Sequence, residues 1–152
     1  MTRNERAILL VEDNPGDVKL MLRALKLHQI QNEVVVARDG VEALDYLFGI
    51  GSHAARDPHA LPEIVILDLN LPKVNGIEVL RRIRTDERTR MLPVIMLTTS
   101  TEERDVVASY RHGINSYVQK PMDFDVFSLA VRQLALYWLN LNINPPPPEA
   151  GQ

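Results

Sequence analysis

The sequence predicts an α/β domain built on a doubly wound parallel sheet, and two observations support this fold class. Five short apolar runs alternate along the chain with five segments in which apolar residues recur at helical spacing. The runs are apolar at consecutive positions, which is typical of strands that helices cover on both faces. Short connections between such units imply a parallel sheet with helices on both faces, and right-handed crossovers then limit the topology to a doubly wound fold. In folds of this kind the functional site lies just beyond the carboxyl ends of the strands.

The first two strand–helix units show both patterns. An apolar run over residues 7–11 predicts the first strand, and apolar residues at i, i+3, i+4 and i+7 after the turn at 14–16 predict a helix. The residues at this spacing are Val18, Met21, Leu22 and Leu25. Residues 33–37 form the second predicted strand, and a short helix follows over 40–48. Its apolar face is Val41, Leu44, Leu47 and Phe48.

The next two units keep the same order. A strand over 64–67 is apolar throughout, and a strand over 94–97 precedes a predicted helix over 102–112. The helix between these strands is marked by Ile77, Val79, Leu80 and Ile83. Gly113 stands where helices commonly end in a left-handed residue, so it predicts the end of the fourth helix.

The fifth unit has a short strand over 116–118 and the last helix. Asp123 is the predicted N-cap of this helix, which is expected to run to about Asn140. The stripe predicted to face the sheet is Phe127, Val131, Leu134, Trp138 and Leu141. Further apolar side chains lie outside that stripe, namely Leu129, Leu136, Leu139 and Ile143.

Two segments depart from the alternation of strands and helices. Residues 49–63 form a connection longer than the usual helix-to-strand loop. The prolines at 145–148 cannot continue a helix and predict an extended polyproline tail. We therefore expect one domain over 6–140, followed by a proline-rich C-terminal extension over 141–152.

Composition excludes several classes of protein. The chain has 152 residues, 45% of them apolar, so it can bury the core of one domain. It has no cysteine, which excludes disulfides, thiolate nucleophiles and cysteine-bound metals. A net charge of −3 argues against a general nucleic-acid surface. Because no signal peptide or membrane span is visible, we expect a cytoplasmic protein that binds neither nucleic acid nor membrane.

Polar side chains follow four of the five predicted strands. Glu12 and Asp13 follow the first, Asp68 the third, Thr98 the fourth and Lys120 the fifth. The fold gathers these strand ends at one edge of the sheet. Carboxylates suit Mg²⁺, and a carboxylate can also attack phosphorus to form an aspartyl phosphate. A lysine and a hydroxyl can hold the equatorial phosphoryl oxygens, so the group suits phosphoryl transfer.

In kind, order and spacing these residues resemble the signature of response-regulator receiver domains, the phosphoacceptor modules of two-component signalling. The matching segments are 11–14, 67–72 with Gly76, 97–100 and 120–121, and the resemblance covers about residues 6–140. It implies a flavodoxin-like, CheY-like fold with strand order 2-1-3-4-5. It also implies a signalling protein that catalyses only its own phosphorylation and dephosphorylation, rather than an enzyme.

The resemblance assigns roles to the acidic positions. Asp68 would take a phosphoryl group from a phosphohistidine of a sensor histidine kinase. Asp13, Asp68 and the backbone carbonyl of Asn70 would bind Mg²⁺ directly, and Glu12 would act mostly through water.

The remaining positions would respond to the phosphoryl group. Thr98 and Lys120 would contact its oxygens, and Tyr117 would be the switch aromatic whose rotamer follows the movement of Thr98. The Lys120–Pro121 peptide bond would be cis and would aim the lysine inward.

The long connection and the apolar last helix with its extension are similar to single-domain regulators paired with bacterial and cyanobacterial phytochrome kinases. A phytochrome-like histidine kinase is therefore the expected partner. Because the resemblance fills most of the chain, we expect no separate output domain. Phosphorylation would then act through changed protein–protein contacts.

Two other functions fit a doubly wound domain. A phosphatase of the haloacid-dehalogenase type also uses a strand-end Asp and Mg²⁺, but it needs a general acid two residues later, and Asn70 cannot transfer a proton. A flavodoxin-like electron carrier needs a loop rich in Ser, Thr or Gly after the first strand, where this chain has Glu12, Asp13 and Asp17. Both functions are disfavoured.

The excess apolar surface of the last helix has two interpretations. Either the tail folds back over it, or a second copy of the chain covers it. We favour a symmetric homodimer through the last two helices and the strand between them. The candidate interface residues are Val107, Tyr110, Leu129, Leu136 and Leu139.

Overall fold

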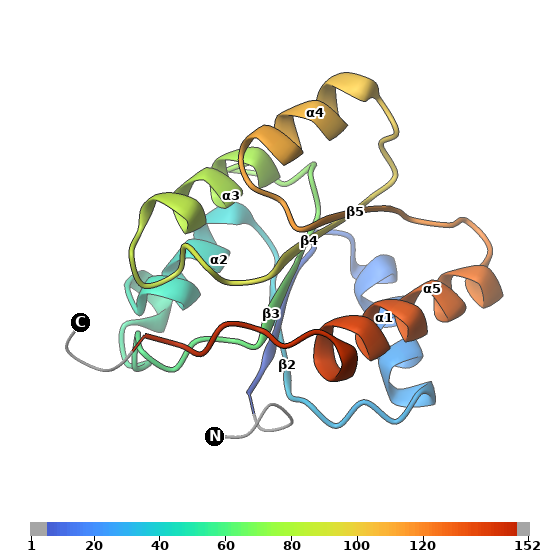
Figure 1. Cartoon of the computed structure of the whole chain (residues 1–152), viewed down its shortest axis with the longest axis horizontal. Coiled ribbons are helices and arrows are strands. Elements are labelled where there is room, and N and C mark those ends of the chain that lie inside the picture. The colour runs from blue at the N-terminus through green and yellow to red at the C-terminus, as the bar shows by residue number, and fades with distance from the viewer. Residues whose placement is uncertain (1–5, 149–152) are drawn as a thin grey trace.

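A computed structural model describes residues 6–148 and contains five strands and five α-helices in alternation (Figure 1). The strands are β1 (Ile8–Val11), β2 (Val34–Ala37), β3 (Ile64–Leu67), β4 (Val94–Thr98) and β5 (Ser116–Gln119). They form one sheet in the order β2-β1-β3-β4-β5, and every neighbouring pair is parallel. The predicted fold class and strand order are confirmed.

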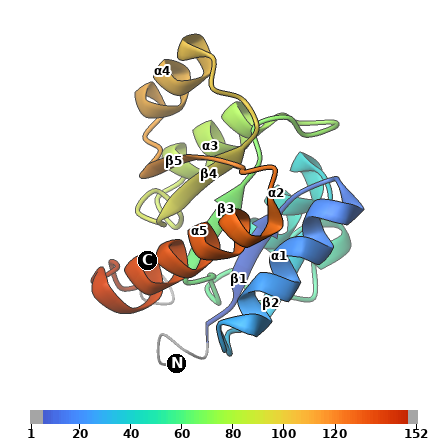
Figure 2. The same cartoon turned by 90° about the vertical axis from the view of Figure 1, so that its right-hand side faces the viewer.

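Helices cover both faces of this sheet. They are α1 (Pro15–Leu27), α2 (Gly40–Phe48), α3 (Gly76–Thr85), α4 (Glu103–Arg111) and α5 (Phe124–Leu136). Figure 2 shows α1 and α5 side by side on one face, with α2, α3 and α4 on the other. The crossovers therefore wind in both directions from the centre of the sheet, as a doubly wound fold requires.

Each strand supplies side chains to two separate cores, because successive residues of a strand point to opposite faces. In β1, Leu9 and Val11 pack into the core under α2 and α3, whereas Ile8 and Leu10 pack into the core under α1 and α5. None of these four side chains is more than 3% exposed. This burial on both faces explains why the strand sequences are apolar without alternation.

Side-chain caps fix where most helices begin. Asp39 and Asn75 each accept a hydrogen bond from the backbone amide three residues later, at the starts of α2 and α3. Asp123 caps α5 as predicted. Helix α4 has no side-chain bond from its N-cap residue, and Gly113 follows its C-cap with a φ of 88°. The predicted stop at Gly113 is thus confirmed.

Two residues of the predicted apolar stripes of α1 and α2 are partly exposed. Leu22 in α1 is 38% exposed and Val41 in α2 is 40% exposed. Both lie at the border of the apolar stripe, and the small residues Ala24 and Ala43 take the fully buried positions instead. The sequence period locates the stripe but not its edges.

The end of the last helix also differs from the prediction. The α-helix stops at Leu136 and continues as a π-helical turn over Tyr137–Leu141. Because a π-turn is wider than an α-turn, it shifts the phase of the residues that follow. Leu139 turns inward and is 4% exposed, whereas Leu141 turns outward and is 75% exposed. The predictions that Leu141 faces the sheet and that Leu139 lies in a dimer interface are therefore wrong.

The C-terminal extension runs beneath the sheet, at the amino ends of the strands (Figure 1). Asn144 Nδ2 donates to Glu63 Oε1 at 2.7 Å and to the Trp138 carbonyl at 2.9 Å. The prolines that follow border a pocket with Leu61 and Leu92. Along its described part, up to residue 148, the tail does not bury the outer face of α5. Within the same part of the chain, no helix has the length and apolar character needed to cross a membrane.

Candidate functional site

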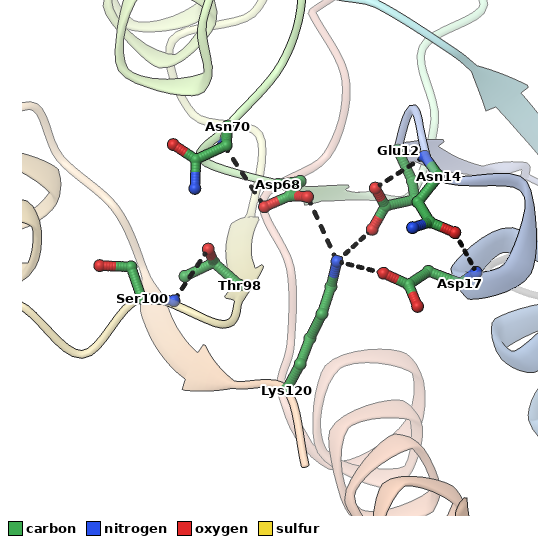
Figure 3. Close-up of polar contacts among 8 residues, drawn as sticks. All are labelled: Glu12, Asn14, Asp17, Asp68, Asn70, Thr98, Ser100 and Lys120. Atoms are coloured by element: carbon green, nitrogen blue, oxygen red, sulfur yellow. Dashed lines mark hydrogen bonds and ion pairs between the residues drawn. The ribbon is translucent and has the colours of Figure 1, made fainter. Parts of the chain in front are cut away.

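Four strand ends meet at the carboxyl edge of the sheet (Figure 3). Glu12 and Asp13 follow β1, Asp68 follows β3, Thr98 ends β4 and Lys120 follows β5. The site lies where the chain order reverses, between β1 and β3, which is the usual binding position in such a sheet. The structure therefore brings the predicted acidic residues and the lysine together.

Lys120 is the centre of the polar contacts. Its ammonium group donates to Glu12, to Asp17 Oδ2 at 3.0 Å and to Asp68 Oδ2 at 3.2 Å. The Lys120 side chain is 9% exposed. Burial alone would lower the pKa of Lys120, but the hydrogen bond to Glu12 and the charge of Asp68 outweigh it and raise this pKa above its usual range. The lysine thus stays charged within the acidic cluster.

Glu12 is a buried carboxyl with an unusual pKa. Burial, followed by the negative charge of Asp68, raises the pKa of Glu12 to about 7, although the hydrogen bond from Lys120 acts in the opposite direction. The second carboxylate oxygen, Oε2, accepts a hydrogen bond from the Asn14 amide at 3.2 Å. This bond ties the carboxylate to the start of α1.

The acidic residues form a donor set that fits a divalent cation. Glu12, Asp13 and Asp68 each offer a carboxylate oxygen, and these oxygens lie within 4.8 Å of one another. Asp13 is exposed to solvent, so the set is open on one side, while the other two carboxylates are buried. Hard oxygen donors with room for water suit Mg²⁺ or Mn²⁺.

Asp68 is held by the loop that leads into α3. The Asn70 amide lies 3.4 Å from Asp68 Oδ1, and the Gly76 amide donates to the Leu69 carbonyl at 2.8 Å. A Cβ atom at Gly76 would lie 2.3 Å from the Asp68 carbonyl oxygen, so only glycine permits this approach. Metal binding by the Asn70 carbonyl stays a prediction.

Thr98 is connected to the first turn of α4 through Ser100. Thr98 is fully buried, and its Oγ1 accepts a hydrogen bond from the Ser100 amide at 3.3 Å. The Ser100 hydroxyl donates to Asp105 Oδ2 at 2.6 Å, and the Ser100 carbonyl accepts a hydrogen bond from the Tyr117 hydroxyl at 2.9 Å. Burial raises the pKa of Tyr117, so its hydroxyl remains a donor.

The peptide bond conformation that the resemblance implies before Pro121 is wrong. The Lys120–Pro121 peptide bond is trans, not cis. The Lys120 amide donates to the Thr98 carbonyl at 2.7 Å, which extends the pairing of β5 with β4 by one residue. With this trans bond the lysine side chain reaches Glu12 and Asp68.

Asp17 is the site residue that sequence reasoning missed. It lies in the first turn of α1 and joins the acidic cluster through its contact with Lys120. A carboxylate four residues after Asp13 is a weak signal, because an acidic residue in the first turn of a helix is ordinary. Only the position of the lysine shows that Asp17 faces the site.

Comparison with known proteins agrees with this geometry. The model of the response regulator receiver domain matches residues 8–132. The probable methanogenesis regulatory protein FilR2 of Methanothrix harundinacea is 42% identical over 140 residues, which is 92% of this chain and 88% of that protein.

Three solved structures resemble the whole fold. The phosphorylated cyanobacterial phytochrome response regulator RcpA is 37% identical to this chain, with a TM-score of 0.86. The Mn²⁺-bound form of response regulator Rcp1 is 35% identical, with a TM-score of 0.85. Each of these two matches covers 93% of this chain and 99% of the other chain. The bacteriophytochrome response regulator AtBRR is 52% identical with a TM-score of 0.73, and the match covers 91% of this chain and 99% of that one.

The family match and the site point to the same class of protein. Receiver domains bind a divalent metal in an acidic pocket, and Rcp1 has been solved with Mn²⁺. The phosphatase alternative has no support, since Asn70 cannot serve as its general acid. This chain belongs to the response regulator receiver domain family and is a response regulator of two-component signalling.

Proposed function

We propose that this response regulator accepts a phosphoryl group on Asp68 from a sensor histidine kinase in a Mg²⁺-dependent step. The observation that carries the proposal is the position of Asp68, which lies between two further carboxylates and the Lys120 ammonium at the strand ends. An Asp68 carboxylate oxygen would attack phosphorus, and the bond from phosphorus to the histidine nitrogen would break. The electron pair of that bond leaves with the imidazole.

Several residues would together stabilise the negative charge on the phosphoryl oxygens. Glu12, Asp13 and Asp68, with the Asn70 carbonyl, would hold the metal, which neutralises charge on the phosphoryl oxygens when bound. Lys120 would contact a phosphoryl oxygen as the second cation, and the Thr98 hydroxyl would donate to another. The protein catalyses only its own phosphorylation and dephosphorylation in this scheme.

The signal would leave the site through Thr98. If its hydroxyl turns toward the phosphoryl group, the hydrogen bond from the Ser100 amide must change. The Ser100 hydroxyl also donates to Asp105 of α4, and the Ser100 carbonyl accepts from the Tyr117 hydroxyl. Both side chains would therefore respond to the same movement. The surface formed by α4, β5 and α5 would then change its affinity for partners.

We further propose a phytochrome-class histidine kinase as the partner. Support comes from similarity to RcpA and AtBRR, which are described as phytochrome and bacteriophytochrome response regulators. The receiver unit would comprise residues 6–140, and residues 141–152 would be its extension.

The exposed apolar residues suggest that the regulator is a homodimer. Val107 and Tyr110 on α4 are 40% and 53% exposed, and Leu129 and Leu136 on α5 are 54% and 42% exposed. Up to residue 148, the tail leaves these four side chains exposed, which favours a second copy of the chain as their cover. We refer to these four residues as the α4–α5 patch.

Phosphoryl transfer can be tested with a small donor. The chain is incubated with phosphoramidate and Mg²⁺, and the intact mass is followed over time. We expect one phosphoryl adduct on the wild-type chain, none on Asp68→Asn and none on the wild-type chain with excess EDTA. Labelling of Asp68→Asn at the wild-type rate would show that another residue is the acceptor.

A further inference from the structure

Asp17 contacts the lysine of the site without belonging to the metal-binding set. Its Oδ2 lies 3.0 Å from Lys120 Nζ, and Figure 3 shows it approaching the ammonium from the α1 side, next to Glu12. A lysine ammonium has three protons to donate. Glu12, Asp17 and Asp68 accept from it, so each proton has one carboxylate partner.

A capping role for the Asp17 side chain is contradicted by the contacts at the start of α1. Asn14 is the N-cap, and its side chain accepts a hydrogen bond from the Asp17 amide at 3.1 Å. In a reciprocal capping box, the Asp17 carboxylate would accept a hydrogen bond from the backbone amide of Asn14. That amide donates to Glu12 Oε2 instead. The Asp17 carboxylate is therefore free of the helix terminus and directed at Lys120.

We propose that Asp17 is a positioning residue that holds Lys120 in place for phosphoryl transfer. The proposal rests on the function assigned above to Asp68. When the phosphoryl group is bound to Asp68, the hydrogen bond that Lys120 now donates to Asp68 would go to a phosphoryl oxygen instead. Glu12 and Asp17 continue to accept the other two hydrogen bonds from the ammonium, which therefore stays within reach of the new acceptor. Glu12 alone would leave the long lysine side chain free to rotate about one contact.

This role depends on an oxygen acceptor at position 17 and not on its charge alone. The Asp17 side chain is 36% exposed, so its charge is partly screened by solvent. Removing the charge also reduces repulsion of an anionic phosphoryl donor, which would mask a loss of positioning. A useful pair of variants must therefore lose the same charge and differ only in the acceptor.

Asp17→Asn and Asp17→Ala form that pair. Both remove the negative charge, and only Asn keeps an oxygen that can accept from Lys120. The rate of phosphoryl uptake from phosphoramidate with Mg²⁺ is followed by intact mass. We expect Asp17→Ala to be slower than Asp17→Asn by about threefold to tenfold, the effect of one hydrogen bond of ordinary net strength at a partly exposed position. Equal rates for the two variants would overturn the proposal.

A Lys120→Met background separates positioning from a general effect on the fold. If Asp17 acts through Lys120, the difference between Asn and Ala at position 17 disappears when the ammonium is absent. A difference that persists in Lys120→Met would assign Asp17 to helix stability and overturn the proposal. Should Lys120→Met take up too little phosphoryl group to measure, urea unfolding of the four variants gives the same comparison. The Asn-to-Ala ratio of unfolding constants must then differ between the two backgrounds, and an unchanged ratio rejects the inference.

The outcome also separates this inference from the function of Asp68. If the wild-type chain shows no adduct, the proposed phosphoryl transfer fails. If the wild-type chain is labelled on Asp68 and the two Asp17 variants behave alike, only the positioning role fails.

Discussion

At the scale of single residues, Gly76 shows how closely the backbone surrounds the candidate phosphoacceptor. A Cβ atom at this position would lie 2.3 Å from the Asp68 carbonyl oxygen and 2.8 Å from Leu69 Cα. Both neighbours are backbone atoms, so no side-chain rotation can relieve the overlap. Either the start of α3 or the loop that carries Asp68 would have to move.

Gly76→Ala should therefore impair stability and phosphoryl uptake together. Overpacking of this kind costs about 1–3 kcal/mol of unfolding free energy. Urea denaturation and the phosphoramidate assay measure the two effects. Gly16→Ala is the matched control, because its new Cβ would meet only the tip of the Asn14 side chain, at 3.1 Å. A Gly76→Ala variant as stable and as reactive as this control would show that the loop adapts without cost.

Strand ends could be predicted at this scale, whereas side-chain directions could not. Glu12 and Asp68 each directly follow an apolar run, and Lys120 stands two residues after the last predicted strand. Parallel strands bring such positions together, so these three could be predicted. Asp17 could not be recognised, since its first-turn position also fits an ordinary helix start. Arg84, which stands close to Arg81 and Arg82 in the sequence, is another example, because its side chain donates to the carbonyls of Leu92 and Gly113.

At the scale of elements, the start of α2 depends on the carboxylate of Asp39. This carboxylate accepts a hydrogen bond from the Glu42 amide at 2.8 Å. That bond lowers the pKa of Asp39 below its ordinary value of 3.8, against the opposing effect of burial and with help from Lys73. The ionised form is thus favoured in the folded chain.

The lowered pKa predicts how stability depends on pH. Ionised Asp39 stabilises the fold above the unfolded-state pKa, and this contribution is lost as the pH falls through the lower folded-state value. Asp39→Asn keeps a capping oxygen but does not titrate. We expect the stability advantage of the wild-type chain over Asp39→Asn to shrink from about pH 5 to about pH 3 in urea unfolding. An advantage that grows over this range would contradict the assignment.

Asp39→Ala serves as the control for the cap itself. It removes the acceptor at every pH, so it should cost about 1 kcal/mol at neutral pH. A variant that lost no stability there would show that the start of α2 does not depend on its cap.

Elements were predicted well where one period persists, and poorly where it changes. The bounds of α2 and β3 agree with the residues expected from their apolar patterns. A single helical period predicts the last helix as a regular α-helix, but its final turn is π-helical. That change reversed the faces of Leu139 and Leu141, and no local sequence signal marks it.

At the scale of the whole molecule, the two faces of the sheet are covered unequally. On one face, α1 and α5 pack against each other and share a core that includes Phe127 and Trp138. On the other, α4 buries only Ser109 among its residues and reaches the site through Ser100 and Asp105. A helix with so little buried surface can shift at low cost. It also forms one side of the α4–α5 patch.

A second copy covering this patch would bury Leu129 and Leu136, and full burial of a leucine contributes about 1.5–3 kcal/mol. We therefore expect the wild-type chain to show twice its mass of 17.2 kDa in light scattering at micromolar concentration. Leu129→Asp combined with Leu136→Asp should give the monomer mass, because a symmetric interface would carry each charge twice. Ile50→Asp is the control, since Ile50 is 52% exposed just after α2, outside the patch, and it should leave the dimer intact. A monomeric wild-type chain, with and without the phosphoryl group, would exclude the dimer.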